Sequence, residues 1–416
     1  MSFSITVAAK QAKKAARQVA NLTAEQRNQL LADIADSLLS SVPAILVANE
    51  KDLAEGKING LDAAMLDRLA LDPVRIQGIA DAVLEIAGQS DPVGSISKIE
   101  RMPSGIQVGK MRIPLGVIAM IYESRPNVTI DAAALCLKAG NAVVLRGGKE
   151  ALHSNLALSE CIKSALAKQQ LDPAAVVVVP DTDRAVMNEL MTLNESIDLI
   201  IPRGGEGLIR FVSENSRVPV IQHYKGVCHL YVDSAADEAK ALDLLKNGKT
   251  QRTGVCNSLE TLLVHQDIAG TFLPKAAALL AEHSTVIHAC ENSMRYFDGA
   301  QVATEDDWHA EYLAMEIAVK VVTDFDLAVE HIEEYGSGHT EVIASQDYSK
   351  TQAFIRRVNS AVVMANASSR FSDGGQLGLG AEIGISTSKL HAYGPMGAES
   401  LTTEKFIVMG DGEVRG

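Results

Sequence analysis

Cys256 is the residue whose type and surroundings best suit covalent chemistry. It lies in residues 250–258, TQRTGVCNS, a polar turn that contains glycine and precedes a predicted strand, with Lys249 and Arg252 close by in the chain. Cationic neighbours and free backbone N–H groups lower the pKa of a thiol, and the thiolate attacks carbonyl carbons. Because a free cysteine is also commonly a small buried hydrophobe, the turn alone leaves a nucleophile and a core residue both open.

Asn127 could stabilise the negative charge that such an attack creates. It follows the apolar residues 117–122 in the segment ESRPN, which begins at Glu123 and also contains Arg125. A side-chain amide at the end of a buried strand is a suitable donor to an oxyanion. The alternative is that Asn127 caps a helix that begins near Val128.

Two glycine corners could bind an anion. The first, RGGK, starts at Arg146 after the apolar residues 142–145, and the second, RGGEG, contains Gly204 and Gly205 after residues 198–201. A strand that turns through glycine into a helix presents backbone N–H groups to an anion. Neither corner has the full GxGxxG or GK[ST] spacing, so a plain strand–helix turn explains each one equally well. Two such corners at one edge of a parallel sheet nevertheless predict a ligand crevice.

Metal and disulfide spacings are absent from the sequence. The ten histidines are scattered and form no HExxH pattern, and the five cysteines form no CxxC pair. We therefore expect no catalytic metal, no structural zinc and no disulfide scaffold. Cys136 and Cys161 lie in apolar helical patterns, and we expect both in the core.

Alternating strands and helices must position these residues. Residues 1–90 read as helices, with a capping box from Thr23 to Gln26 and a helix start at Asp72 and Pro73. Short runs rich in Val and Ile then alternate with helical stretches, which predicts parallel, doubly wound α/β sheets in two domains. The predicted strands are residues 117–122, 142–145, 176–179, 198–201 and 218–221 in the first domain, and 229–232, 259–264, 286–288, 317–322, 341–344 and 361–364 in the second.

A hairpin and a glycine-rich tail interrupt this pattern. Residues 96–102 and 106–113 are short runs joined by a PSG turn, and residues 368–397 form a long loop region. Unpaired strand edges invite another chain, so we expect a homo-oligomer. A long glycine-rich loop between ordered segments is more typical of a site than of a linker.

Composition excludes several classes of protein. The chain has 416 residues, a formal charge of −14 and no run of 18 apolar residues. A negative protein is a poor binder of nucleic acid or of an anionic membrane surface. We expect a soluble, cytoplasmic protein, since no signal-peptide core is visible either.

Several motifs in order resemble the aldehyde dehydrogenase superfamily. They are residues 143–149, 200–208, 250–260, Glu316 and residues 401–405. Within it, residues 63–69, 122–129, 144–150, 201–205 and 374–382 look like the γ-glutamyl phosphate reductase family, over essentially the whole chain. That resemblance implies NADPH-dependent reduction of L-glutamyl 5-phosphate to L-glutamate 5-semialdehyde, the second step of proline synthesis, through a cysteine thioester.

The resemblance also implies a fold and an arrangement of domains. The expected fold is aldehyde dehydrogenase-like, with a cofactor-binding domain in residues 1–95 and 114–222 and a catalytic domain in residues 223–385. Residues 96–113 and 386–416 would form an oligomerisation element.

Residue roles follow from the same motifs. Cys256 matches the nucleophile, and Asn127 with the Cys256 backbone N–H matches the oxyanion hole. Arg146 takes the place of a lysine that binds the adenosine ribose of NADPH, Gly204 and Gly205 face its phosphates, and Glu316 matches the carboxylate that binds the nicotinamide ribose.

One departure from hydrolytic relatives favours acyl-phosphate chemistry. Residues 220–226, VIQHYKG, contain no carboxylate where those enzymes carry a water-activating glutamate. Water needs a general base to attack a thioester, whereas phosphate is already an anionic nucleophile. The alternatives are a non-phosphorylating dehydrogenase that oxidises a small aldehyde to an acid, with His223 as its base, or a nucleotide-binding protein without the chemistry.

An anionic substrate also requires local positive charge in a protein of net charge −14. We expect it from four cations near the motifs, each of which could instead be a solvated surface charge. They are Arg125, Lys249, Arg252 and Arg370.

Overall fold

The computed structural model describes residues 3–415 and divides the chain into two compact units. Unit 1 runs as far as Gln222 and also contains Gly378–Gly384 and the chain from Met396 onward, while unit 2 comprises His223–Leu377 and Ile385–Pro395. Residues 386–416, which the sequence analysis groups in one element, are therefore shared between the two units. Each unit is described by itself.

Five helices open unit 1, and their ends follow the capping signals of the sequence. The hydroxyl of Thr23 accepts a hydrogen bond from the backbone N–H of Gln26, and the Gln26 side chain accepts one from the N–H of Thr23, which confirms the capping box. Asp72 caps the fifth helix, with Pro73 at its first position. The helices are α1 (Ile5–Ala20), α2 (Ala24–Ser40), α3 (Val42–Ile58), α4 (Ala63–Leu69) and α5 (Pro73–Gly88).

The core of unit 1 is a four-stranded parallel sheet with the order β5-β4-β3-β6. Every residue of β3 is buried, as expected for a strand that helices cover on both faces. The alternate residues Val117, Ala119 and Ile121 pack in one cluster with α1. The elements are β3 (Val117–Tyr122), α6 (Asn127–Lys138), β4 (Ala142–Arg146), α7 (Leu152–Lys168), β5 (Val176–Val178), α8 (Arg184–Leu190), β6 (Leu199–Arg203) and α9 (Glu206–Asn215).

The strand predicted over residues 218–221 is not formed. Only an isolated parallel bridge joins Val220 to Ile200 there. Pro219 has no N–H to donate to a ladder, which disfavours a regular strand at this position.

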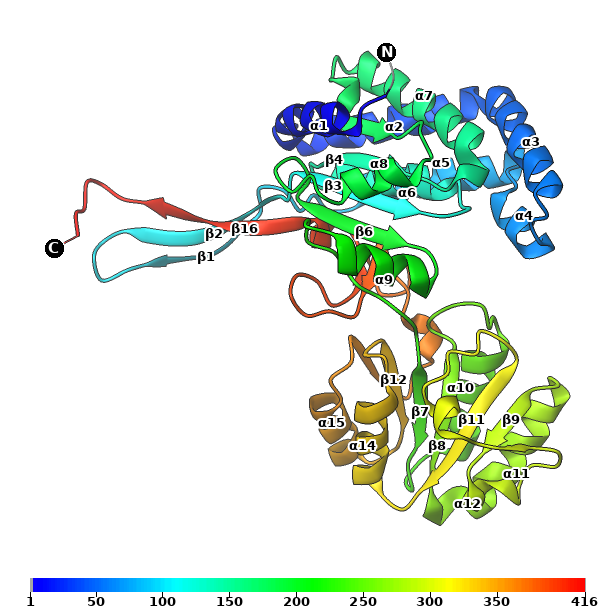
Figure 1. The fold of residues 1–416 in the computed structure, drawn as a ribbon. Coiled ribbons are helices and arrows are strands. Elements are labelled where there is room, and N and C mark those ends of the chain that lie inside the picture. The colour runs from blue at the N-terminus through cyan, green and yellow to red at the C-terminus, as the bar shows by residue number, and fades with distance from the viewer. Residues whose placement is uncertain (1–2, 416) are drawn as a thin grey trace. The chain divides into compact units, whose positions relative to one another are not determined.

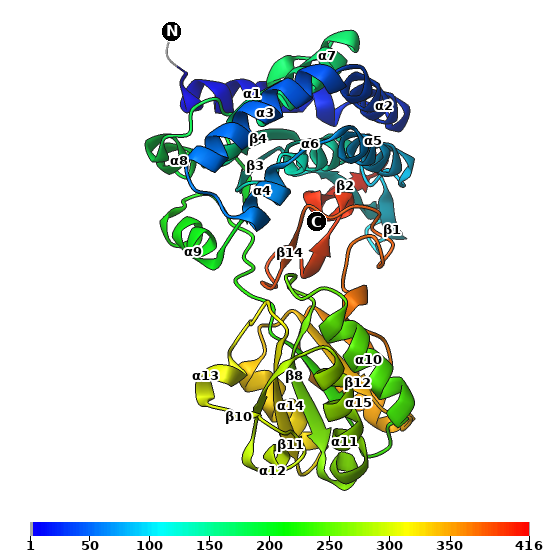
Figure 2. The ribbon, with the colours of Figure 1, turned by 90° about the vertical axis from the view of Figure 1, so that its right-hand side faces the viewer.

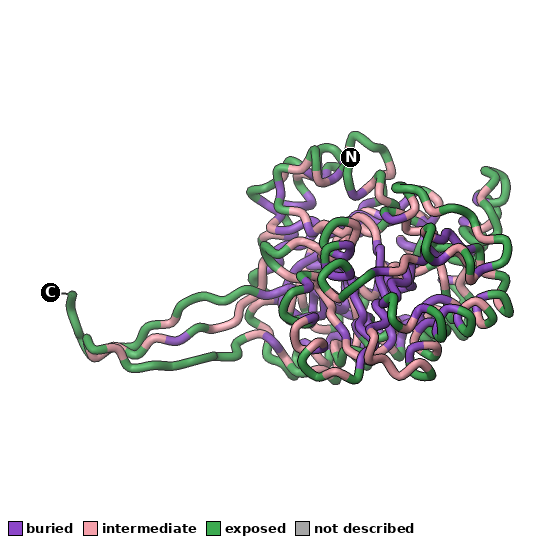
Figure 3. The backbone as a smooth tube through the Cα atoms, turned by 90° about the horizontal axis from the view of Figure 1, so that it is seen from below, coloured by how far each residue is buried: buried purple, intermediate pink, exposed green. Residues whose placement is uncertain are grey.

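A three-stranded antiparallel arm extends from unit 1 (Figure 1). Its order is β1 (Ile96–Arg101), β2 (Gln107–Pro114) and β16 (Thr402–Met409), so the predicted hairpin pairs with the end of the chain. β1 is exposed throughout, and Figure 3 shows how little of the arm is buried compared with the body of the unit. β1 and β16 each leave one edge unpaired within the arm.

Unit 2 is built on a seven-stranded parallel sheet with the order β10-β9-β11-β8-β7-β12-β13. Along β8, Leu262 and Val264 pack in one cluster with α10 and α11, while Leu263 packs in another with α14 and α15. The helices therefore cover both faces, as Figure 2 shows and as the sequence predicts. The strands are β7 (Cys228–Val232), β8 (Leu259–His265), β9 (Val286–Ala289), β10 (Gln301–Val302), β11 (Glu316–Val322), β12 (Thr340–Ala344) and β13 (Val362–Ala365).

The helices of unit 2 follow their strands in regular crossovers. They are α10 (Glu238–Thr250), α11 (Gln266–Glu282), α12 (Glu291–Met294), α13 (Glu305–Trp308), α14 (Phe325–Tyr335) and α15 (Tyr348–Arg357). Two short strands, β14 (Gly384–Ser386) and β15 (Gly394–Met396), lie in the region predicted as a glycine-rich loop.

Among residues 3–415, no single helix is long and apolar enough to cross a membrane. Only α2 and α3 taken together, with a 70° bend between them, meet the requirements of length and composition.

Candidate functional site

Cys256 lies in the loop between α10 and β8, and its side chain is partly exposed. A close backbone approach fixes this loop, because a Cβ added to Gly226 would lie 2.0 Å from the Cys256 carbonyl oxygen. The buried thiol of Cys228 donates to that same carbonyl at 3.2 Å. Cys136 and Cys161 are buried in helices as predicted, so Cys256 differs from both.

Neighbouring residues anchor the loop further. The Asn257 amide donates to the Ser372 carbonyl at 2.8 Å, and the Ser369 hydroxyl donates to the Asn257 carbonyl at 2.7 Å. Both partners belong to the glycine-rich region predicted to be a site. These hydrogen bonds connect that region to the loop that carries the thiol.

Lys249 does not have the environment expected of a substrate-binding cation. Its side chain is fully buried, and its Nζ donates to Glu260 Oε2 at 2.7 Å. Burial raises the pKa of Glu260 to about 7, although Lys249 opposes the shift. Since α10 ends beside Lys249 and Glu260 lies in β8, this ion pair joins the two elements that flank the Cys256 loop.

Arg370 lies beside a polar cavity of about 380 Å³. Its Nε donates to Gln251 Oε1 at 3.0 Å, while its Nη1 is buried and has no hydrogen-bond partner among residues 3–415. Burial and the nearby charge of Arg252 lower the pKa of Arg370, and the charges of Asp373 and Cys256 oppose this. The cavity is lined by Asn247, Gln251, Arg370, Phe371, Asp373 and Gln376.

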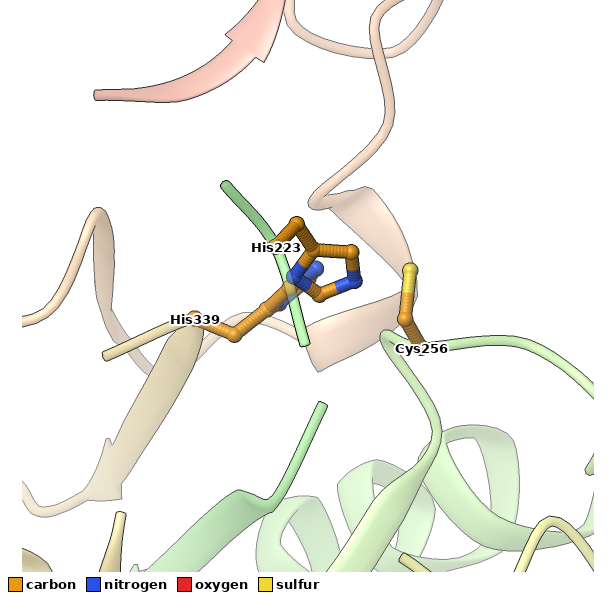
Figure 4. Close-up of side chains that lie close together, drawn as sticks. All are labelled: His223, Cys256 and His339. Carbon is orange, nitrogen blue, oxygen red and sulfur yellow. The ribbon is translucent and has the colours of Figure 1, made fainter. Parts of the chain in front are cut away.

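Two histidines lie beside Cys256 in unit 2. Ligand atoms of His223, Cys256 and His339 are all within 4.8 Å of one another, and the two imidazole rings lie 5.1 Å apart (Figure 4). His339 is 1% exposed, and burial lowers its pKa to about 3. His223 is a candidate base from the sequence, whereas His339 is remote in the chain and belongs to no local motif.

Glu316 begins β11 and is hydrogen-bonded within its own unit. Its Oε1 lies 2.5 Å from His288 Nε2, and His288 Nδ1 lies 3.0 Å from Asp307 Oδ1. Its side chain is 30% exposed. The carboxylate is therefore oriented by a histidine that sequence reasoning did not single out.

In unit 1, Asn127 is the first residue of α6 and does not cap it. Its Nδ2 instead donates to Asp131 Oδ2 at 2.8 Å, one turn further along the same helix. Burial raises the pKa of Asp131 to about 6, and the Asn127 hydrogen bond and the Arg203 charge oppose the shift. Arg125 lies just before α6 and is exposed.

Carboxylates of the chain itself fill the two predicted anion corners. The backbone N–H of Gly205, the N-cap of α9, donates to Glu123 Oε2 at 3.1 Å. At the other corner, the Glu150 carboxylate lies against Gly148, where an added Cβ would be 2.1 Å from Oε1, and this oxygen accepts from the N–H and hydroxyl of Ser124 at 2.8 and 2.7 Å. A negative group at Gly205 is what the N-terminus of a helix favours.

Arg146 ends β4 and keeps donor capacity for a ligand. Its Nη2 donates to the Thr182 carbonyl at 2.7 Å, while its Nε is buried without a hydrogen-bond partner among residues 3–415. A Cβ added to Gly205 would have no atom within 4 Å, so there is space on that side of the turn, whereas Glu123 lies against the neighbouring Gly204. An orphaned guanidinium N–H together with an anion-binding helix start fits the ribose and phosphate groups of a dinucleotide.

Comparison with known proteins gives matches along nearly the whole chain. Residues 3–296 match the aldehyde dehydrogenase family. The chain is 59% identical over 414 residues to gamma-glutamyl phosphate reductase of Colwellia psychrerythraea, covering 99% of both chains. It is 56% identical to the same-named protein of Salinibacter ruber, covering 100% of this chain and 95% of that one.

Solved structures agree with these matches. The crystal structure of gamma-glutamyl phosphate reductase from Thermotoga maritima superposes with a TM-score of 0.98 at 42% identity, with 100% of each chain covered. An acetylating aldehyde dehydrogenase from Geobacillus thermoglucosidasius has a TM-score of 0.70 at 17% identity over 99% of this chain and 97% of that one, which shows the shared fold. The predicted aldehyde dehydrogenase-like α/β fold is thereby confirmed, and the chain belongs to the aldehyde dehydrogenase family and, within it, to the γ-glutamyl phosphate reductases.

Proposed function

We propose that the chain reduces L-glutamyl 5-phosphate to L-glutamate 5-semialdehyde and phosphate with NADPH, the second step of proline biosynthesis from glutamate. The observation that carries this proposal is the 59% identity, over 99% of both chains, to a protein named for the reduction of γ-glutamyl phosphate. The partly exposed thiol of Cys256 in its anchored loop supports it. The enzyme uses a nicotinamide cofactor, as its family does, and the choice of NADPH is part of the proposal.

Cys256 is the proposed nucleophile. Its thiolate attacks the C5 carbonyl carbon, the C5–O bond breaks, and phosphate leaves with the electron pair, which forms a γ-glutamyl thioester. When bound, a nicotinamide cofactor would supply the hydride that reduces this thioester. Collapse of the resulting thiohemiacetal then breaks the C–S bond, which returns the thiolate and releases the semialdehyde.

Asn127 is the proposed side-chain donor to the tetrahedral oxyanions, together with the backbone N–H of Cys256. The Asn127 amide nitrogen carries two N–H groups, and its hydrogen bond to Asp131 occupies one of them. The other is available to an oxyanion, and the Asp131 contact restricts rotation of the amide.

Arg370 is proposed to bind the α-carboxylate of the substrate. The substrate carries a carboxylate, an ammonium group and a phosphate, and the polar cavity beside Arg370 offers Asp373 as a partner for the ammonium. The buried Nη1 of Arg370 gains a partner when a carboxylate binds there. Arg252 and Arg125 are proposed for the phosphate, whereas the burial of Lys249 against Glu260 leaves it without a direct role in this proposal.

Arg146, Gly204, Gly205 and Glu316 are proposed to bind the cofactor. The orphaned Nε of Arg146 suits the adenosine ribose, and the start of α9 suits the phosphates. Glu316, oriented by His288, suits the hydroxyl groups of the nicotinamide ribose.

The decisive experiment runs the reaction in the oxidative direction with glutamate 5-semialdehyde and NADP⁺. Formation of NADPH is expected to require inorganic phosphate, because residues 220–226 offer no carboxylate to activate water. Formation of NADPH at the same rate without phosphate would instead identify a non-phosphorylating dehydrogenase.

A variant pair tests the nucleophile in the same assay. Cys256→Ala should lose at least roughly a thousandfold in kcat, since no other group forms the covalent intermediate. Cys290→Ala is the matched control, because Cys290 is also partly exposed and lies in unit 2. Normal turnover by Cys256→Ala would refute the mechanism.

A homo-oligomeric state and a cytoplasmic location remain predictions from the sequence. The arm of unit 1 supports the first of them, because both of its outer strands have an unpaired edge.

A further inference from the structure

Three side chains of unit 2 bring together the ligand types that zinc prefers. Figure 4 shows His223, Cys256 and His339, which come from three separate segments of the chain. One ligand atom from each lies within 4.8 Å of the other two. Thiolate sulfur and neutral imidazole nitrogen are the common ligands of Zn²⁺ in proteins. No local spacing in the sequence predicts this group, since the histidines lie far from Cys256 along the chain.

The hydrogen bonds around His339 favour the tautomer that leaves Nε2 with its lone pair. The Thr340 hydroxyl donates to Ser372 Oγ at 2.7 Å, so its oxygen is left to accept a hydrogen bond from His339 Nδ1, also at 2.7 Å. A proton on Nδ1 leaves Nε2 as the nitrogen with the lone pair. Fixing one ring nitrogen through a second hydrogen bond is how proteins orient their metal-binding histidines.

Nε2 of His339 has no hydrogen-bond partner in the described part of the chain. This nitrogen is buried, and the side chain is 1% exposed. A buried nitrogen without a partner is costly, and a bound cation would satisfy it.

The three ligand atoms need to move only slightly closer together to bind an ion. A tetrahedral zinc ion with ordinary Zn–N and Zn–S bonds places its ligand atoms about 3.3–3.6 Å apart. The three atoms here lie within 4.8 Å. Cys256 and His223 are both partly exposed, so small side-chain rotations can close the difference. The fourth coordination position would be taken by water or an oxygen of the substrate.

We propose that His223, Cys256 and His339 form a binding site for one Zn²⁺ ion or a similar borderline-soft divalent cation, and that the bound ion reversibly inhibits the enzyme. The sulfur of Cys256 is then a ligand of the bound ion, so the thiolate cannot attack an acyl carbon. Metal binding depends only on the geometry of the three residues. The inhibition rests on the proposed role of Cys256 as the nucleophile.

Cobalt(II) titration of the free, full-length enzyme tests the binding site without reference to activity. Co²⁺ replaces Zn²⁺ in such sites and gives a thiolate-to-metal charge-transfer band together with the visible bands of tetrahedral coordination. We expect these bands to saturate at one ion per chain and to disappear when Zn²⁺ is added. Their absence would overturn the proposal.

Variants identify the ligands. Cys256→Ser should abolish the charge-transfer band, and His339→Ala should weaken cobalt affinity at least about tenfold, since even residues that only support a ligand contribute that much. His223→Ala should have the same effect and provides a second test, because His223 is less buried and its loss disturbs the core less. His283→Ala, at the end of α11, is the control and should leave the affinity unchanged. Unchanged affinity in both His339→Ala and His223→Ala would contradict the proposal.

Alkylation provides an internal control within one molecule. Zn²⁺ should protect Cys256 from iodoacetamide and leave Cys290 reactive, because Cys290 is also partly exposed but lies outside the cluster. Peptide mass spectrometry measures both thiols together. Equal protection, or none, would contradict a specific site.

Activity assays separate this inference from the proposed function. Zn²⁺ should inhibit turnover, and a chelator should restore it fully. Cobalt bands with uninhibited turnover would contradict the inhibition alone. Normal turnover by Cys256→Ala would contradict the proposed function and leave the cobalt result standing.

Discussion

The contact between Asn127 and Asp131 decides between two possible roles of Asn127. Local sequence allows Asn127 either to cap a helix or to donate to an oxyanion. The structure excludes the cap, since Asn127 lies inside α6 and its amide donates to Asp131. Asp131 carries no signal in the sequence because it reads as an ordinary helix residue.

The raised pKa of Asp131 gives a prediction for stability against pH. Because the folded state keeps the Asp131 proton up to about pH 6, the contribution of this group is complete at low pH and is lost as the pH rises through that value. Asp131→Asn stays neutral and keeps an acceptor for Asn127. It should therefore unfold less readily than the parent above pH 6, by at most about 3 kcal/mol, with the difference vanishing near pH 4.

Urea denaturation at a series of pH values measures this effect. Asp81→Asn on the exposed face of α5 is the control and should follow the parent at every pH. A constant difference between Asp131→Asn and the parent from pH 4 to pH 8 would show that Asp131 does not titrate in this range.

Glu123 gives a second prediction at the scale of one residue. Its carboxylate accepts the Gly205 N–H at the start of α9, where the proposal places the cofactor phosphates. Glu123→Gln removes a negative charge that competes with and repels those phosphates. The KM for NADPH should therefore fall severalfold while kcat changes little. A raised KM would indicate that the Glu123 charge assists the bound cofactor, and Glu206→Gln on the same helix controls for general charge effects.

At the scale of elements, the ion pair of Lys249 and Glu260 joins the end of α10 to β8. Both side chains are fully buried, and the loop with Cys256 lies between them in the chain. A buried ion pair is weak evidence for stability, but loss of one partner leaves the other charge uncompensated. The pair is therefore best understood as a device that positions the loop.

Lys249→Met should destabilise the protein by about 3–5 kcal/mol at pH 8, where the unpaired Glu260 must either ionise in the core or take up a proton. Adding Glu260→Gln to this variant should restore part of the loss, because the uncompensated charge is removed. Thermal unfolding measures both variants. Lys163→Met breaks the exposed pair with Glu160 and should have little effect. A loss in the double variant as large as in Lys249→Met would argue against this explanation.

At the scale of the whole molecule, the arm of β1, β2 and β16 exposes large apolar side chains to solvent. Phe406 is 71% exposed and Val408 is 59% exposed, and alternation along a strand places them on the same face of β16. An exposed apolar face of this kind is expected to pack against a second chain.

Charges on this face should dissociate the predicted homo-oligomer. Phe406→Asp with Val408→Asp should lower the mass measured by sedimentation or light scattering to that of one chain, because the carboxylates would be buried at the contact. Thr403→Asp, on the opposite face of β16, is the control. An unchanged mass in the double variant would show that this face of the arm does not hold chains together.

Features that depend on local pattern could be predicted from neighbouring residues alone. Strand and helix alternation, the capping box at Thr23 and the polar turn around Cys256 are each encoded within a few neighbouring residues. Motifs in a fixed order were specific enough to indicate the family, which the comparisons confirmed. The prediction of a strand over residues 218–221 from its Val and Ile content was wrong, since only an isolated bridge forms there.

Which polar groups meet depended on the tertiary structure. It buried Lys249 against Glu260, placed Glu123 on the Gly205 N–H and brought His339 beside Cys256. Each of these contacts joins segments that the chain brings together only when its sheets assemble, so no spacing in the sequence encodes them. The type of a residue sets the chemistry that it can perform, whereas its burial and its partners decide whether that chemistry is available.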